Sequence, residues 1–165
     1  MEQTQTFQTL NTVYQPIYSY VHILLNLLKE RAYNYTWGFY NNHTIMIERN
    51  WAIEYYPIPV ITINGLCDIG IDIDHIFIEC KLGREQAISF DWNTFSMYSF
   101  EVYGVEDYLN DFYSPTLPLE SISQKIMQST ESQIAIAFHF AYLEDPKVLI
   151  DFIEVLHRII IIPEI

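Results

Sequence analysis

Residues that could do chemistry gather in one short stretch, GLCDIGIDIDHIFIECKL, which spans residues 65–82. It contains four carboxylates and a histidine: Asp68, Asp72, Asp74, His75 and Glu79. Carboxylate oxygens are the ligands that Mg²⁺, Mn²⁺ and Ca²⁺ prefer, and an imidazole can join them. The spacing matches neither the EF-hand loop nor the HExxH motif. A small carboxylate-metal enzyme using Asp68, Asp72, His75 and Glu79 is therefore an alternative hypothesis and not the leading one.

Other catalytic patterns are missing from the sequence. The five glycines are scattered, with no GxGxxG or Walker motif for phosphate binding. There is no GxSxG nucleophile elbow, and the five histidines lie far apart along the chain. We therefore expect that the protein is not an enzyme and has no catalytic residues, no resident metal and no cofactor.

The alternation of apolar residues predicts that residues 67–80 form a β-hairpin. Folding back at Ile73-Asp74 places Asp72 opposite His75 and Asp68 opposite Glu79, and a four-residue loop closed by an Ile71–Ile76 pair fits equally well. A slip of one residue would move the apolar set to the other face, so this set selects the register. Cys67 and Cys80 then face each other in the core as small buried thiols, and a redox pair is the alternative. Opposed carboxylates destabilise a sheet, so the Asp68–Glu79 pair either faces water or requires Lys81, a metal or a basic partner.

A second notable segment, residues 98–113 (YSFEVYGVEDYLNDFY), interleaves aromatic and acidic side chains. Tyrosine is enriched at interaction surfaces, and nearby acids orient a basic partner. The alternative is that the aromatics fill the core and the acids face water. If the two segments bind a partner, the contacts predicted are Asp68, Asp72, Asp74, Glu79, Tyr103, Glu106, Asp107, Tyr108, Asp111 and Tyr113.

The charge of the chain is unevenly distributed. Its 165 residues carry a net charge of −13 and are 50% hydrophobic. Residues 66–113 hold ten acids and two bases, a net of −8, whereas residues 1–65 hold four acids and three bases, a net of −1. A strongly acidic protein is a poor partner for DNA or RNA, because phosphate binding requires a basic surface. The acidic middle either keeps an apolar protein in solution or docks a basic partner.

The periodicity predicts a single α+β domain over residues 1–165: a mainly antiparallel sheet of six or seven strands, with an N-terminal and a C-terminal helix packed mainly on one face. We expect a first helix from Pro16 to about Ala32 and a last helix opened by Asp145-Pro146. Residues 105–113 fit a short helix or a loop, and a further helix ends near Ser129. The candidate strand segments, from which about six or seven strands are expected, are 35–40, 44–56, 60–64, 66–72, 76–82, 87–92, 98–103 and 134–142, with a turn at Asn41-Asn42 and a break at residues 57–59.

Compartment and partner follow from the same features. The N-terminus lacks a basic signal region and no apolar run reaches membrane-spanning length, so we expect a soluble, cytoplasmic protein without membrane contact. In size, acidity and aromatic content the chain is similar in kind to small bacterial immunity proteins. That resemblance covers its general character and implies an inhibitor that neutralises a basic, nuclease-like toxin domain. A third hypothesis is an oligomeric or structural subunit that self-associates through the Tyr-rich first helix and residues 159–165.

Overall fold

The computed structural model describes the backbone of residues 2–47, 51–107 and 110–160, and the side chains of residues 14–39, 58–107 and 110–160. Seven antiparallel strands form one sheet in the order β1-β2-β3-β4-β7-β5-β6. The strands are β1 (Tyr35–Ile47), β2 (Trp51–Ile63), β3 (Cys67–Ile71), β4 (His75–Gly83), β5 (Ser99–Gly104), β6 (Asp111–Tyr113) and β7 (Gln133–Ala141). The predicted α+β class and antiparallel sheet are confirmed.

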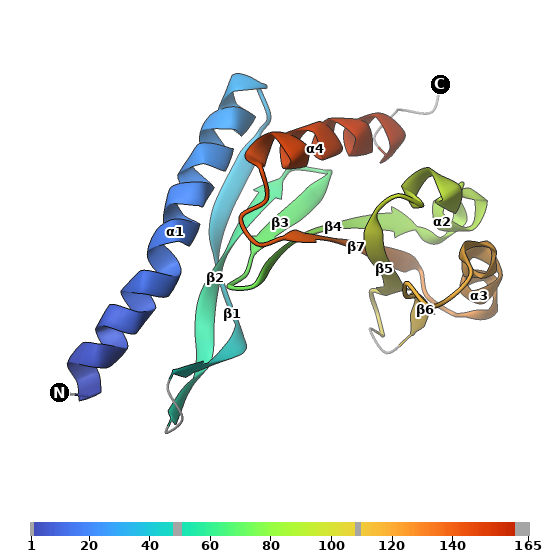
Figure 1. Ribbon diagram of the computed structural model, residues 1–165. Coiled ribbons are helices and arrows are strands. Elements are labelled where there is room, and N and C mark those ends of the chain that lie inside the picture. The colour runs from blue at the N-terminus through green and yellow to red at the C-terminus, as the bar shows by residue number, and fades with distance from the viewer. Residues whose placement is uncertain (1, 48–50, 108–109, 161–165) are drawn as a thin grey trace.

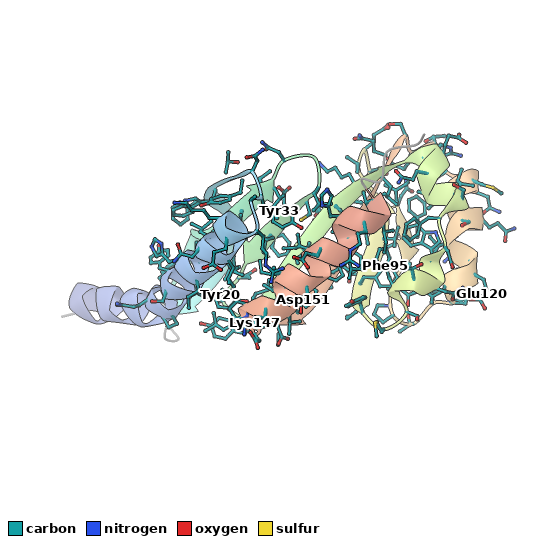
Figure 2. All side chains as sticks on the ribbon, turned by 90° about the horizontal axis from the view of Figure 1, so that it is seen from above. Tyr20, Tyr33, Phe95, Glu120, Lys147 and Asp151 are labelled. Atoms are coloured by element: carbon teal, nitrogen blue, oxygen red, sulfur yellow. The ribbon has the colours of Figure 1, made fainter. Side chains whose placement is uncertain are left out.

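The helices pack mainly on one face of this sheet (Figure 1). They are α1 (Glu2–Glu30), α2 (Arg84–Ser89), α3 (Ile122–Gln128) and α4 (Pro146–Ile160), with two short 3₁₀ turns, η1 (Trp92–Phe95) and η2 (Leu119–Ser121). Figure 2 shows α4 lying between α1 and the α2–α3 end of the molecule. Apolar residues at helical spacing in α1 and α4, including Ile17, Val21, Leu24, Ile153 and Leu156, join one core cluster. None of the helices in the described residues has the length and apolarity that a bilayer crossing requires.

The predicted start of the first helix is wrong because tertiary packing overrides a local signal. The first helix does not begin near Pro16: α1 starts at Glu2 and contains Pro16 in its interior. Proline costs the helix one backbone hydrogen bond there. The buried side chains on either side of it, Tyr14 and Ile17, anchor the helix to the core.

The strand break predicted at residues 57–59 and the turn predicted at Asn41-Asn42 are also wrong. Strand β2 runs through both prolines, with Pro59 opposite Phe39 and Pro57 opposite Asn41. The two prolines are two residues apart, so both ring nitrogens face the same edge of the strand. The β2–β3 ladder reaches only as far as Val60, so no hydrogen bond to β3 is required at either proline. The irregularity on β1 is a shift in register between Asn41 and Ile45 instead of a turn.

The region after β4 departs from the prediction as well. The strand expected at residues 87–92 is the short helix α2 followed by η1. Ala87, Trp92 and Phe95 are buried, and the Trp92 indole N–H donates to the Ala87 carbonyl (3.2 Å). These apolar residues belong to helical segments that pack against the sheet and not to a strand within it. Within 105–113, where a short helix or a loop is expected, the described residues 105–107 and 110 lie outside helices and strands, and Asp111–Tyr113 form the three-residue strand β6.

The register of the β3–β4 hairpin is the one that the apolar pattern selects. Asp68 pairs with Glu79, Ile69 with Ile78, Gly70 with Phe77 and Ile71 with Ile76. The Asp72 backbone N–H donates to the His75 carbonyl (2.9 Å), so these two residues face each other across the bend at Ile73-Asp74. This register determines which hairpin side chains face the helices and which face away from them.

Candidate functional site

The face of the sheet turned away from the helices carries a row of carboxylates. Register places Thr62, Asp68, Glu79, Ala137 and Glu101 side by side across β2, β3, β4, β7 and β5. The neighbouring rows contain Phe77 beside His139, and Tyr103 beside Asp111. The hairpin and the aromatic-acidic segment, separate in the sequence, therefore meet on one surface because β7 inserts between β4 and β5.

A groove runs along this surface, and the sequence of β7 explains it. Facing away from the core, β7 presents the small side chains Ala135 and Ala137, whereas the strands on either side present larger ones. The resulting depression has a volume of about 420 Å³. It is lined by Phe77, Glu79, Glu101, Tyr103, Asp111, Ala137 and His139. Among these described residues are three carboxylates and no lysine or arginine, so we name this feature the acidic groove.

Tyr103 and Glu79 form the central polar contact of the groove. The Tyr103 hydroxyl donates a hydrogen bond to Oε2 of Glu79. Burial, together with that bond, raises the pKa of Tyr103 well above its ordinary value. The phenol therefore remains a protonated donor at physiological pH.

The remaining groups of the groove are more loosely held. His139 Nε2 lies 3.6 Å from Oε2 of Glu101, and its ring centroid lies 5.6 Å from that of His75. Asp111 and Glu101 are exposed. Two carboxylates at the rim are thus accessible to a cationic group that approaches from solvent.

The opposed pair Asp68 and Glu79 is accommodated by hydroxyl groups. Thr62 Oγ1 donates to Oδ1 of Asp68 (2.7 Å), and Glu79 accepts from Tyr103. Each carboxylate thus has a neutral donor on its own side, which lowers the cost of placing the two opposite each other. Asp68, Glu79 and Lys81 also line a second depression of about 280 Å³.

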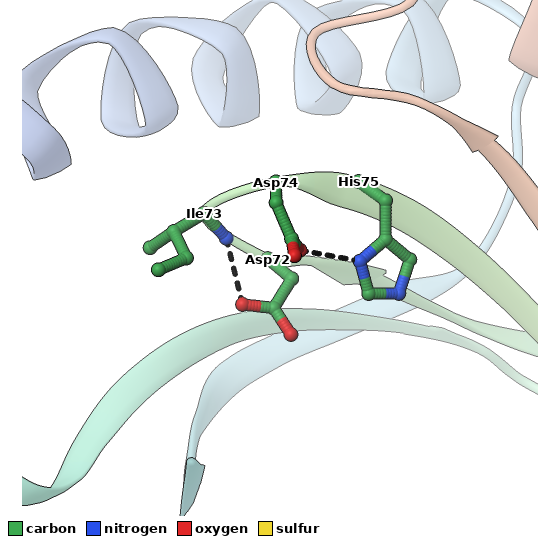
Figure 3. A network of polar contacts seen from close by, with 4 residues as sticks. All are labelled: Asp72, Ile73, Asp74 and His75. Carbon is green, nitrogen blue, oxygen red and sulfur yellow. Dashed lines mark hydrogen bonds and ion pairs between the residues drawn. The ribbon is translucent and has the colours of Figure 1, made fainter. Parts of the chain in front are cut away.

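The hairpin bend holds the candidate metal ligands (Figure 3). Asp72 is buried, and its Oδ1 accepts from the Ile73 backbone N–H (2.7 Å). Asp74 is exposed, and its Oδ1 lies 2.6 Å from Nδ1 of His75. Ligand atoms of Asp72, Asp74 and His75 lie within 4.8 Å of one another, and this is the group of three that the described residues bring together. It differs from the predicted set, because Asp68 and Glu79 lie farther along the strands. Three ligands are also fewer than the six to eight oxygens of a calcium site.

The loop before β6 is fixed by a carboxylate that the sequence analysis did not single out. Glu131 is 2% exposed and accepts hydrogen bonds from the backbone N–H groups of Glu106 (2.9 Å) and Asp107 (2.8 Å) and from Nδ2 of Asn110 (3.1 Å). Burial alone would raise the pKa of Glu131, but these three donors outweigh it and lower the pKa. The glutamate serves as an internal anchor for Glu106, Asp107 and Asn110.

The predicted contact residues therefore separate into groups. Glu79, Tyr103 and Asp111 line the acidic groove, with Asp68 in the same row, while Asp72 and Asp74 lie at the hairpin bend. Glu106 accepts from the backbone N–H of Ser132 (3.1 Å), and Tyr113 stacks on Phe100 with ring centroids 4.7 Å apart on the core side. Asp107 is exposed beside the Glu131 anchor, and Tyr108 lies outside the described residues.

The predicted contacts omit four lining residues of the groove: Phe77, Glu101, Ala137 and His139. The signal that could have located them is the alternation in residues 134–141, where every second residue away from the core is alanine or histidine. Small residues on the solvent face of a central strand indicate a depression between its neighbours. Which strands are its neighbours depends on the β4-β7-β5 order, in which β7 lies between two strands that come much earlier in the chain. No local sequence pattern indicates this order.

The two cysteines behave as small buried residues. Cys67 and Cys80 are free and buried, and burial raises the pKa of both thiols, that of Cys80 to about 12. Both are therefore protonated and poorly nucleophilic at physiological pH.

Comparison with known proteins identifies a shared fold. No family model matches the sequence, and no curated protein matches it significantly. A solved structure of a conserved hypothetical protein from Pyrococcus furiosus is similar, with a TM-score of 0.69 and 19% identity over 94% of this chain and 96% of the other. The arrangement of strands and helices is therefore shared over nearly the whole length of both chains.

Proposed function

We propose that this chain is a protein-binding module of the inhibitor or immunity type, whose open sheet face receives the basic surface of a partner. The observation that carries the proposal is the acidic groove. Its three carboxylates, from β4, β5 and β6, converge on one depression that has no lysine or arginine among its described lining residues. A cationic side chain of the partner would enter between them.

The net charge of the middle of the chain supports the binding of a basic partner. Ten acids against two bases in residues 66–113 give this part of the chain a net charge of −8. A concentrated negative field accelerates encounter with a positively charged partner and suppresses encounter with acidic proteins. A domain that acts on nucleic acid carries the complementary charge, which favours a nuclease-like toxin as the partner class.

The aromatic and polar groups of the groove support binding over catalysis. Tyr103 and Phe77 offer aromatic surface next to the carboxylates. Such a combination suits an arginine, whose side chain can stack on the rings while its guanidinium pairs with a carboxylate. The Tyr103 phenol is held by Glu79, so its orientation is set before a partner arrives. Such pre-organisation reduces the entropy lost on association.

The test is to capture the partner by cross-linking in the native cell, express the captured protein alone, and measure its association rate by stopped flow. The double variant Glu101→Gln/Asp111→Asn removes two charges from the groove without touching the Tyr103–Glu79 bond. We expect a basic partner whose association slows several-fold in the variant and whose rate falls with added salt.

A matched control removes the same charge elsewhere. Glu120→Gln/Asp151→Asn neutralises two exposed carboxylates on η2 and α4, neither of which lines the groove; both are labelled in Figure 2. Association should be nearly unchanged in this control. An acidic partner, or equal slowing in the two double variants, would contradict the proposal.

A further inference from the structure

The first edge of the sheet, strand β1, is exposed over most of its described side chains. Strand β1 spans 13 residues, YTWGFYNNHTIMI, with no charged residue and no proline, and it is the terminal strand of the sheet. Residues 36–39 are exposed. Edge strands ordinarily carry lysine, proline or a covering loop, because their free N–H and C=O groups pair with any other strand. In the described part of the chain, no further strand pairs with the outer side of β1.

Exposed aromatic side chains accompany this edge. Trp37 and Phe39 are 43% and 49% exposed and lie with ring centroids 5.4 Å apart. Tyr18 of α1, 39% exposed, meets Phe39 edge to face at 6.2 Å. We call Tyr18, Trp37 and Phe39 the edge aromatic patch. Aromatic area gathered beside open backbone hydrogen-bonding groups is typical of a surface that is covered in the functional state.

The charge distribution favours a second copy of this chain as the molecule that covers the β1 edge. Residues 1–65 have a net charge of −1, whereas residues 66–165 hold 17 acids and five bases, a net of −12. Two copies of this protein repel each other in most orientations. They approach at least cost when the nearly neutral α1–β1–β2 ends meet and the acidic ends point apart. A basic partner, by contrast, is attracted to the opposite end of the molecule.

From these observations we infer that two copies pair through antiparallel β1 strands related by a two-fold axis near Gly38. Such an isologous contact satisfies the edge groups of both copies at once. It places Trp37 of each copy across from Phe39 of the other, so the two patches join on the helix-bearing side. Gly38 has nothing within 4 Å of the position a Cβ would occupy, so the opposite side of the pair is open at the axis. The acidic groove remains free in both copies.

Sedimentation of the full chain tests this inference. We expect a species of twice the 19.6 kDa chain mass that dissociates on dilution. Added salt should strengthen it by screening the mutual repulsion, opposite to its effect on a basic partner. Trp37→Glu/Phe39→Glu should weaken association at least tenfold, because like charges would then face each other across the pair.

The control adds the same charge at other exposed apolar sites. Met97→Glu/Met127→Glu changes residues that are 81% and 54% exposed and lie outside α1 and β1, and it should leave the dimer intact. Hydrogen exchange of the unmodified protein gives a readout independent of any variant: amides of residues 35–39 should exchange more slowly as concentration rises. A monomer at every concentration and salt, a dimer unaffected by Trp37→Glu/Phe39→Glu, or exchange independent of concentration would overturn the inference. The outcome is independent of partner binding at the groove.

Discussion

The two ends of the sheet are built on different principles. At the β1–β2 end, long strands carry nearly neutral sequence and leave aromatic side chains exposed at the edge. At the β5–β6 end, short strands are closed by buried aromatics and by one buried carboxylate, while acids cover the outside. The β5–β6 end is thus complete by itself, whereas the β1–β2 end presents backbone and aromatic groups that a further molecule can satisfy.

The largest contrast between the ends should appear when aromatic residues are truncated. Phe100 is 1% exposed and contacts Trp92, Phe95, Tyr113 and Phe138. Phe100→Ala should lower the free energy of unfolding by about 3–5 kcal/mol, from lost burial and the remaining cavity. Trp37→Ser, at the other end, should cost about 1 kcal/mol or less. Urea denaturation of both variants in dilute protein measures the difference, and equal losses would remove the distinction.

The second contrast concerns the polar anchor of the β5–β6 end. Glu131→Gln places an amide N–H₂ where a carboxylate oxygen accepts from backbone N–H groups of residues 106 and 107. The expected loss is about 1–3 kcal/mol, the cost of a buried donor without an acceptor. Glu120→Gln, an exposed site, is the control and should be neutral. Urea denaturation decides between them.

The same anchor predicts a dependence on pH. The folded pKa of Glu131 lies below its ordinary value of 4.5, so its contribution to stability is fully present above pH 4.5 and is lost as pH falls through the folded pKa. The difference in stability between the unmodified protein and Glu131→Gln should therefore shrink on acidification below pH 4.5. A constant difference across that range would show that the carboxylate charge is not what stabilises the loop.

A small effect is expected where helix α1, which covers the β1–β2 end, contacts the segment before α4. The Tyr20 hydroxyl on α1 donates to the Glu144 carbonyl (2.6 Å), just before α4, near the position labelled in Figure 2. Tyr20→Phe should cost about 1 kcal/mol, the net value of one such bond. Thermal unfolding should then remain a single transition; a separate early transition would indicate that the ends unfold independently.

Sequence reasoning succeeded where a residue's neighbours are close in the chain. The hairpin register followed from alternating isoleucines, and the start of α4 followed from Asp145-Pro146, where Asp145 accepts from the Lys147 backbone N–H (3.0 Å). In each case one local pattern decides the outcome. The α+β class followed from the change of period between residues 16–32 and 35–103.

Sequence reasoning failed where distant segments decide the structure. Alternation alone predicted a strand at residues 87–92. In the structure, β4 pairs with β7 as far as Gly83↔Gln133, and the residues that follow leave the sheet. The groove could not be assembled for the same reason, since Glu79 and Glu101 become neighbours only across Ala137. Two of its three carboxylates, Glu79 and Asp111, were therefore predicted from the sequence, whereas its shape was not.

Glu131 also limits how this protein can change over evolution. A Cβ at Gly104 would lie 2.2 Å from Oε1 of Glu131 and 2.8 Å from the Asp107 carbonyl oxygen. Acquiring any side chain at position 104 thus demands a shorter residue at 131 and a rebuilt path for the loop, all together. Positions 104 and 131 should consequently be inherited as one unit, and relatives that alter one of them should alter the other.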